Sequence, residues 1–423
     1  MTPHGTSLPV GSRAPHLVEP ELRAVTDETF SAHSRAVALG FEETHHAEIE
    51  ELERRLLVDR SHGFTVGDRW VGTCGSLARR LVVPGGADVA TAAVTAVTVA
   101  APYRRRGLLS AMMTHELERC VERGEPLAAL WASESMIYGR FGYGPAADRL
   151  VLTGTSRRLE FLPDVVVEGS VDDVPREDFL AAVRGLHDEL VRARPGAFVR
   201  DDAVWEFALL DLEFVRRGAM PLHHLLHHAA DGTVDGFATY RYKEGTGDEE
   251  GEVRVKDLVA ESPTAYAGLW RYLLDLDLTR TFRLWCAPVD EPLRHLVRDA
   301  RAVQTEVTDN LYVRLVDLPA ALSARAYAAD LDVVLEVTDE LLPANAGRWR
   351  VTASAGGTAT VTRVEDDPDL SLGILELGTA YLGGPRLADL ARAGRVVEHT
   401  PGALAAASTA FGWHRAPCCP DMF

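Results

Sequence analysis

The hydrophobic pattern of the chain changes abruptly close to Pro102. Before it, Val94, Val97 and Val99 stand among Thr and Ala as a short β-branched run, which predicts a strand. Pro102 ends the run because it has no backbone N–H to donate. Apolar residues then recur at helical spacing and predict an amphipathic helix; they are Leu108, Leu109, Met112, Met113 and Leu117.

Three arginines and a glycine lie between this strand and this helix: Arg104, Arg105, Arg106 and Gly107. A helix that begins here directs its first N–H groups and the positive end of its dipole toward Gly107, and this arrangement favours an anion such as a pyrophosphate. Because Gly107 has no Cβ, a phosphate can come close to the backbone. The alternative interpretation is a surface arginine cluster at an ordinary strand-to-helix turn.

The pattern continues with a second buried strand over Leu127–Trp131 and a short segment that opens with Ser133 and Glu134. That segment carries Tyr138 and is followed by the glycine-rich turn FGYGP over 141–145. The strings YRRRGLL and IYGRFGYGPA together resemble the Eis (enhanced intracellular survival) branch of the GCN5-related N-acetyltransferases (GNAT family). In that family an Arg/Gln-x-x-Gly-x-Gly/Ala segment binds acetyl-CoA, and here Leu109 replaces its last small residue.

The resemblance implies a set of residues that bind acetyl-CoA. Backbone groups of the strand would hold the pantetheine arm and the thioester, and the turn would hold the pyrophosphate. The set is Val97, Val99, Arg104, Arg105, Gly107, Leu108, Leu109 and Ser133.

The resemblance also implies two catalytic groups. Tyr138 matches the family's catalytic tyrosine, and a phenol, with a pKa of about 10, can protonate a leaving thiolate; Tyr143 is assigned to packing. Eis-type chains end in an aromatic residue whose carboxylate is catalytic, which assigns the base to Phe423. A carboxylate pKa of about 3.5 is low for direct attack on an ammonium, so ion pairing with relay through water stays open. The other interpretation of Phe423 is a frayed terminus.

Charge narrows the choice of partner. The 423 residues carry 44 Lys and Arg against 63 Asp and Glu, a net charge of −19, which disfavours nucleic acid. An acidic cleft attracts a cationic amine, although solubility alone also explains the charge. For such a substrate we expect Phe41 and Glu43 to supply stacking and ion pairing, with Glu42 the weaker candidate.

The predicted fold class is α+β, with two tandem GNAT-like units, the second degenerate, followed by a sterol-carrier-like α/β domain. The expected divisions are a flexible tail over 1–20, an acetyl-CoA-binding domain over 21–160, a degenerate unit over 161–308 and a C-terminal domain over 309–423 that delivers the terminal carboxylate. Asp257–Thr264 stands where the second unit would bind phosphate but has no Arg-x-x-Gly pattern, so one acetyl-CoA per chain is expected. The C-terminal domain is interpreted as a helper, with a lipid-binding groove as the alternative.

Local patterns predict further elements. Residues 69–83 indicate a β-hairpin or one long bent strand, and Asp231-Gly232 indicates the turn of a hairpin. On that hairpin, alternation would place His223 and His227 on one face and His224 and His228 on the other, which disfavours a metal site. Adjacent Cys418 and Cys419 near His414 have the wrong spacing for zinc. We therefore expect no metal.

The odd number of cysteines, five, favours reduced thiols over a disulfide framework. No apolar run approaches the ~18 residues that span a bilayer, and the N-terminal stretch lacks the apolar core of a signal peptide. These features favour a cytoplasmic protein that does not bind membranes.

The predicted activity is transfer of an acetyl group from acetyl-CoA to amines of aminoglycoside-type substrates, with antibiotic resistance as the implied biological role. Two alternatives stay open: acetylation of protein lysines or polyamines, and a non-catalytic acyl-CoA- or lipid-binding protein. The resemblance also implies a homo-oligomer, with hexamers known for the family.

Overall fold

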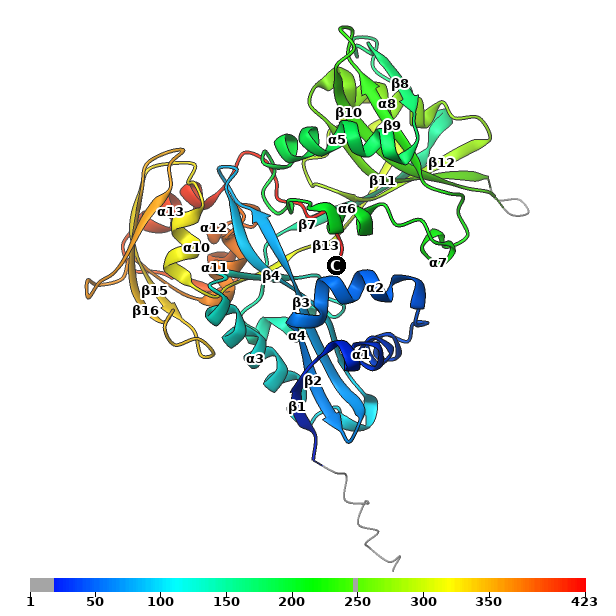
Figure 1. Ribbon diagram of the computed structural model, residues 1–423. Coiled ribbons are helices and arrows are strands. Elements are labelled where there is room, and N and C mark those ends of the chain that lie inside the picture. The colour runs from blue at the N-terminus through cyan, green and yellow to red at the C-terminus, as the bar shows by residue number, and fades with distance from the viewer. Residues whose placement is uncertain (1–18, 246–249) are drawn as a thin grey trace, which may run out of the picture. The chain divides into compact units, whose positions relative to one another are not determined.

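The computed structural model describes residues 19–245 and 250–423, which fold into two compact units (Figure 1). Unit 1 comprises the described residues up to Gly75 together with Ala96–Met113, and unit 2 comprises Ser76–Thr95 and Thr114–Phe423. The tail predicted for residues 1–20 lies outside the described residues, apart from its last two.

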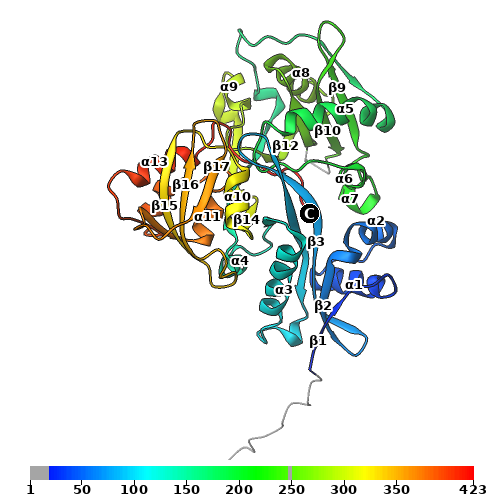
Figure 2. The ribbon, with the colours of Figure 1, turned by 60° about the vertical axis from the view of Figure 1, so that its left-hand side comes forward.

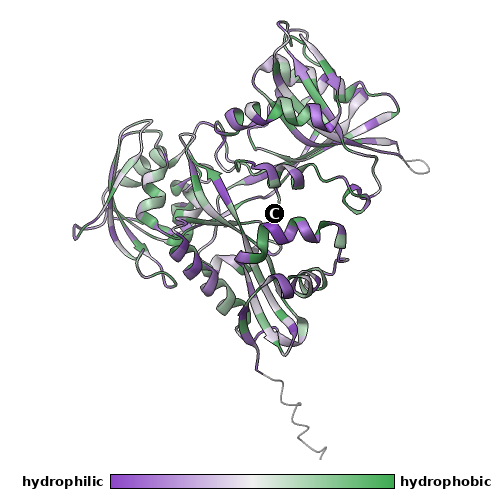
Figure 3. Cartoon of the chain, viewed as in Figure 1, coloured by the Kyte–Doolittle hydropathy of each residue, from purple (hydrophilic) through white to green (hydrophobic). Residues whose placement is uncertain are grey.

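Unit 1 is built on a small antiparallel sheet and two helices. Its strands follow the order β1-β2-β3, and α1 packs Phe30 against Val25 and Trp70. Thr26 is the N-cap of α1, and its N–H donates to the Thr29 hydroxyl at 2.8 Å. Charged residues of α2 form purple segments of that helix in Figure 3. The elements are β1 (Glu21–Ala24), α1 (Asp27–Gly40), α2 (Ala47–Leu57), β2 (Ser61–Val66), and parts of β3 (Arg69–Val82), β4 (Asp88–Val99) and α3 (Leu108–Arg123).

The region 69–83 forms one long strand, β3, so the long-strand alternative is the one that the structure adopts. Gly85 and Gly86 turn the chain into β4 with φ angles of 96° and 83°, which are values that favour glycine.

In unit 2, β4 pairs in parallel with β5 (Leu127–Leu130), as expected for strands joined by a helix. β5 pairs with β14 (Tyr312–Leu315), and β14 pairs with β6 (Gly144–Pro145), so this part of the first sheet has the order β4-β5-β14-β6. Between β5 and β6 lies the short helix α4 (Ser135–Tyr138).

The second sheet has the order β13-β7-β12-β11-β10-β9-β8, with helices on its two faces (Figure 1). Adjacent residues of β9 point to opposite faces: Leu225 joins the core with Trp270 of α8, and Leu226 joins the core with Phe179 of α5. The hairpin with its turn at Asp231-Gly232 is confirmed. The elements are β7 (Asp148–Thr155), β8 (Ser170–Asp173), α5 (Arg176–Val191), α6 (Asp202–Ala208), α7 (Glu213–Arg216), β9 (His223–His228), β10 (Val234–Lys243), β11 (Gly251–Ala260), α8 (Pro263–Leu274), β12 (Thr279–Ala287), α9 (Leu293–Leu296) and β13 (Val303–Asp309).

The third sheet has the order β17-β16-β15-β18-β19 and is covered by α10 and α13 (Figure 2). This region of the described chain contains four helices and five strands. They are α10 (Leu318–Ala324), β15 (Leu331–Thr338), β16 (Gly347–Ala353), β17 (Ala359–Arg363), β18 (Leu370–Gly373), α11 (Ile374–Ala380), α12 (Leu387–Arg392), β19 (Val396–Glu398) and α13 (Ala403–Phe411).

Strand membership crosses the domain divisions expected from the sequence. β7 lies before residue 160 but pairs with β12 and β13 in the second sheet, and β14 lies after residue 309 but pairs with β5 in the first. Each of these two sheets therefore contains one strand from beyond the expected boundary, so boundaries drawn along the chain do not separate the sheets. Among the described residues, no helix is long and apolar enough to cross a membrane.

Candidate active site

The turn Arg104–Gly107, here called the arginine turn, lies exposed in unit 1 between β4 and α3. Arg105 and Gly107 have φ angles of 62° and 82°, so the backbone twice adopts the left-handed region. Arg104 Nε donates to the carbonyl of Val99 at 3.1 Å, which ties the turn to the end of the strand. A Cβ built on Gly107 would meet no atom within 4 Å, so it is the backbone angle that favours glycine in the free protein.

Helix α3 starts directly after the arginine turn, as predicted. Leu108 is buried and Leu109 half-buried, while the N–H of Ala111 donates to the Gly107 carbonyl at 3.0 Å as the first helical bond. The N–H groups that precede this bond have no acceptor within the helix. With three exposed arginine side chains beside them, they provide the donors and the positive charge that a diphosphate requires.

The end of β4 contains a feature that the sequence analysis missed. Ala96 is buried and has a φ of 55°, a conformation that costs a non-glycine residue roughly 1–2 kcal/mol. Thr73 stabilises it, since its hydroxyl lies 2.8 Å from the Ala96 carbonyl and 2.7 Å from the Thr98 hydroxyl. The irregularity immediately precedes half-buried Val97 and Val99, the residues predicted to lie along the thioester. Strained backbone conformations are common at functional sites, but an alanine in the sequence does not indicate one.

The predicted substrate residues Phe41 and Glu43 are exposed in unit 1, directly after α1. Two hydrogen bonds of a Schellman motif hold the backbone of this segment. The Glu43 N–H donates to the Ala38 carbonyl at 2.8 Å, and the Glu42 N–H donates to the Leu39 carbonyl at 3.2 Å. Glu42 takes the left-handed position usually given to glycine, with a φ of 59°. These bonds fix the backbone on which both side chains are presented.

The structure brings this substrate segment to the predicted acetyl-CoA strand. A Cβ added at Gly40, the last residue of α1, would lie 2.5 Å from Cβ of Thr98, so the helix end packs directly on β4. Phe41 therefore follows a residue in contact with Thr98, between Val97 and Val99. No pattern in the sequence predicts that these two segments lie side by side.

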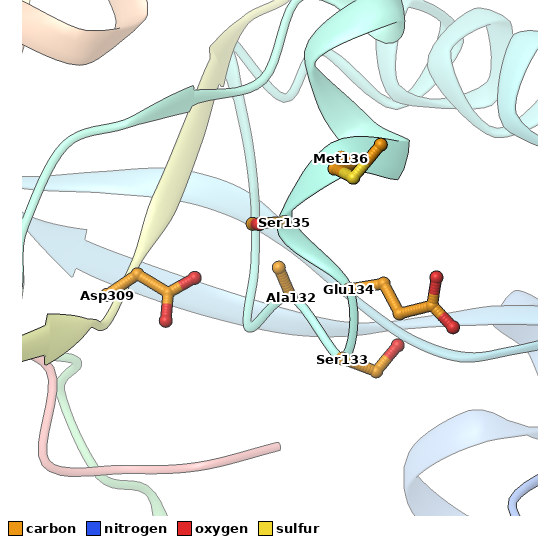
Figure 4. Close-up of a pocket in the computed structure, with 6 residues that line it drawn as sticks. All are labelled: Ala132, Ser133, Glu134, Ser135, Met136 and Asp309. Atoms are coloured by element: carbon orange, nitrogen blue, oxygen red, sulfur yellow. The ribbon is translucent and has the colours of Figure 1, made fainter.

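In unit 2, a pocket of about 370 Å³ lies between β5, α4 and β13 (Figure 4). Ser133, the remaining predicted cofactor residue, lines it together with Glu134, Met136 and Asp309. Asp309 accepts a 2.8 Å hydrogen bond from the Tyr312 hydroxyl. The volume lies in the range of small-molecule sites, and two carboxylates line it.

Tyr138 is buried at the end of α4, and its ring meets that of buried Tyr143 edge to face at 6.2 Å. Gly142, with a φ of 81°, lies in the turn that brings the two rings together. Burial alone does not distinguish the two tyrosines, so the assignment of the acid to Tyr138 stays a prediction.

The residues after α13, here called the C-terminal segment (412–423), are held by many contacts. The side chain of Asn310 exchanges two hydrogen bonds with the backbone of Cys419, at 2.7 and 2.9 Å. Arg194 donates to the Ala416 carbonyl at 2.7 Å. Phe423 is half-buried, and its ring meets Phe198 edge to face at 5.4 Å. Its position is thus defined by packing, which disagrees with the frayed-tail interpretation.

A buried ion-pair network near the end of the segment was also missed. Arg200 donates to Asp421 at 2.6 and 2.9 Å and to Asp257 at 3.2 and 3.3 Å, and Arg79 donates to Asp421 at 3.3 Å. Burial raises the pKa of Asp421, but the two arginines outweigh it and hold that pKa at about 2. Burial, with Arg200 nearby, lowers the pKa of His187 to about 4. These residues are far apart in sequence, so no local pattern reveals the network.

The histidines and cysteines considered for metal binding make other contacts. His227 Nδ1 lies 2.5 Å from Asp235, and His223 Nδ1 lies 2.6 Å from Asp173. Cys418 Sγ lies 3.7 Å from Cys286, with both thiols buried. Within the described part of the chain, neither the four histidines nor the Cys418–Cys419 pair forms a group of three close ligand atoms.

Comparison with known proteins shows the family to which the chain belongs. Residues 21–146 and residues 196–315 each match an acetyltransferase (GNAT) domain family, and residues 318–420 match a sterol carrier protein domain family. An uncharacterized N-acetyltransferase of Streptomyces coelicolor is 45% identical over 389 residues, covering 89% of this chain and 93% of that protein. The N-acetyltransferase Eis of Mycobacterium tuberculosis is 35% identical over 341 residues, covering 78% of this chain and 80% of Eis. The chain belongs to the Eis-like branch of the GNAT family.

Solved structures agree with this assignment. The crystal structure of Eis1 from Mycobacterium abscessus has a TM-score of 0.83 at 32% identity and covers 95% of this chain and 100% of that one. A GCN5-related N-acetyltransferase from Kribbella flavida has a TM-score of 0.78 at 27% identity, covering 96% and 99%. The predicted fold, two GNAT domains followed by a sterol-carrier-like domain, is confirmed. This Eis-like protein is an acetyl-CoA-dependent N-acetyltransferase.

Proposed function

We propose that this Eis-like enzyme acetylates amino groups of aminoglycoside-type polycationic substrates. The observation that supports this most directly is the contact of Gly40 with Thr98, because Gly40 directly precedes exposed Phe41 and Thr98 lies in the strand assigned to the thioester. A carboxylate and an aromatic ring suit a substrate that carries ammonium groups on sugar rings. The net charge of −19 adds long-range attraction for a polycation.

In this proposal each predicted residue has one task. The arginine turn and the first N–H groups of α3 hold the diphosphate of acetyl-CoA, and backbone groups of Val97 and Val99 orient the pantetheine arm and polarise the thioester carbonyl. Ser133 keeps its predicted role as a residue that binds acetyl-CoA. Binding both substrates in one site supplies proximity.

The chemistry then needs three proton transfers. The ammonium of the substrate loses a proton to the Phe423 carboxylate, directly or through water, and the neutral amine forms a C–N bond to the acetyl carbon. As the C–S bond breaks, the sulfur takes a proton from the Tyr138 hydroxyl, and the second proton that the nitrogen loses as the acetamide forms returns to the Tyr138 oxygen. The products are the acetamide, free coenzyme A and one proton released to solvent.

The proposal also includes a cytoplasmic location, a homohexamer and a part in antibiotic resistance, all three carried over from the family resemblance. The mass of the purified protein in solution tests the hexamer, because each chain contributes 46.1 kDa.

The decisive experiment is thiol release from acetyl-CoA with a panel of amines: kanamycin, neomycin, spermidine and a lysine-containing peptide. We expect the highest kcat/KM with the aminoglycosides, and we expect deletion of Phe423 to lower kcat at least about 100-fold, the size of an acid–base contribution, with acetyl-CoA binding unchanged. A higher kcat/KM with spermidine or the peptide would contradict the proposed aminoglycoside substrate class. Full turnover after the deletion would remove Phe423 from the mechanism.

A further inference from the structure

We infer that Arg200 and Asp421 are positioning residues for acetyl transfer: their ion pair holds the C-terminal segment so that the Phe423 carboxylate keeps one place in the enzyme. The inference rests on the proposed catalytic role of Phe423. It adds two residues that touch neither substrate and act only through the chain end.

Asp421 is held at both its side chain and its backbone. One carboxylate oxygen accepts two hydrogen bonds from Arg200, and the other accepts one from Arg79. The backbone carbonyl of Asp421 accepts from Trp131 Nε1 at 3.2 Å and from the Cys419 thiol at 3.2 Å. The aspartate side chain is only 10% exposed, so water competes little for these contacts.

Arg200 is itself fixed on its other side. Its guanidinium also donates to both oxygens of Asp257 on β11 and lies 4.8 Å from the ring centre of Trp205. The network consists of four largely buried side chains, Arg79, Arg200, Asp257 and Asp421, so its two positive and two negative charges balance. A guanidinium fixed in this way defines the place of any carboxylate that binds it, because its N–H groups form a rigid fork.

The distance along the chain from Asp421 to Phe423 is short. Two residues span at most about 7 Å, so fixing Asp421 confines the chain end to a small region. The Phe423 ring meets Phe198 edge to face, and Phe198 in turn lies beneath Arg79, with 4.8 Å between the Arg79 guanidinium carbon and the ring centre. The same arginine thus contacts the carboxylate of Asp421 and the ring that packs on Phe423.

A buried ion pair can also serve stability alone, and the network offers a matched control for that. Asp421→Asn and Asp257→Asn each remove one negative charge from the side of Arg200, and each leaves the arginine one carboxylate. Only the first substitution changes a residue of the C-terminal segment itself, and Asp257→Asn acts on the segment only through Arg200. A role in stability would make the two variants alike, whereas a role in positioning separates them.

The test measures kcat, KM for both substrates, acetyl-CoA affinity and amide hydrogen exchange of residues 412–423 in the full-length enzyme. For Asp421→Asn we expect kcat to fall at least tenfold, faster exchange in the segment and unchanged acetyl-CoA affinity. For Asp257→Asn, which acts on the segment only through Arg200, we expect a smaller loss of kcat and a smaller increase in exchange than for Asp421→Asn. Where Asp421→Asn does not fold, Arg200→Lys takes its place, since lysine keeps the charge but not the paired N–H contacts.

Equal kcat losses in the two aspartate variants, or parental kcat in Asp421→Asn, would overturn the inference. The Phe423 deletion separates this failure from that of the proposed function. If the deletion abolishes turnover while Asp421→Asn keeps it, only the positioning role fails. If the deletion itself keeps turnover, the proposed role of Phe423 fails first.

Discussion

Two turns of this enzyme occupy the same place in related topologies and differ in chemistry. β4 leads through the arginine turn into α3 and on to its parallel neighbour β5, and β11 leads through Glu261-Ser262 into α8 and on to its parallel neighbour β12. In the first turn, the chain exposes three arginines and leaves open space at Gly107. In the second, the Ser262 hydroxyl accepts from the Ala265 N–H at 3.1 Å and donates to Asp235 at 3.2 Å.

The shared strand–turn–helix–strand topology therefore does not by itself create a phosphate site. At α8 the protein caps its own helix with a serine and surrounds it with the carboxylates of Asp235 and Glu261, which repel an anion. At α3 there is positive charge and a glycine instead. The expectation of one acetyl-CoA per chain follows from this difference, and calorimetric titration that gives two sites per chain would contradict it.

The largest expected effect on acetyl-CoA binding comes from two matched glycines. Gly107 has a φ of 82° and Gly232, in the β9–β10 turn, a φ of 86°, and a Cβ at either would meet no atom within 4 Å. Alanine at either place should cost about 1 kcal/mol in the free energy of unfolding. Only Gly107→Ala should also weaken acetyl-CoA binding, by about tenfold or ~1.4 kcal/mol, because its Cβ projects where the diphosphate approaches. Equal affinities of the two variants by calorimetry would reject the phosphate site.

A smaller effect is expected from one arginine side chain. Arg105→Ala should raise the Kd for acetyl-CoA about fivefold at low salt, equivalent to ~1 kcal/mol, by removing one positive charge from the diphosphate site. The difference should shrink toward 1 M salt, where the screening length is about 3 Å. Arg119→Ala is the control, since exposed Arg119 on α3 pairs with Glu122 at 2.7 Å instead. A salt-independent loss would indicate a steric rather than an electrostatic role.

The smallest expected effect on the cofactor comes from the second turn. Ser262→Ala should lower the free energy of unfolding by about 1 kcal/mol through loss of the helix cap and leave acetyl-CoA affinity unchanged. Thermal denaturation and calorimetry measure the two quantities, and Ser262→Thr should keep the cap. A changed affinity would mean that the second GNAT domain takes part in binding.

Several features of the site could be predicted from local sequence. Pro102, the arginines and Gly107 predicted the strand-to-helix turn, and the helix begins at Leu108 as expected. Other features could not, because they depend on contacts between distant residues. The left-handed Ala96 is stabilised by Thr73 from another strand, and Asp421 meets Arg200 more than 200 positions away. The exchange of β7 and β14 between sheets belongs to this second class.

Periodicity, turn residues and local charge are properties of neighbours along the chain, so the sequence alone predicted the elements, the family and the positive charge of the arginine turn. Tertiary structure alone decided which groups meet: Gly40 against Thr98, Phe423 against Phe198, and two arginines around Asp421. The physical reason is that a buried ion pair or a close backbone contact needs partners in space, and the spacing of residues along a chain does not specify them.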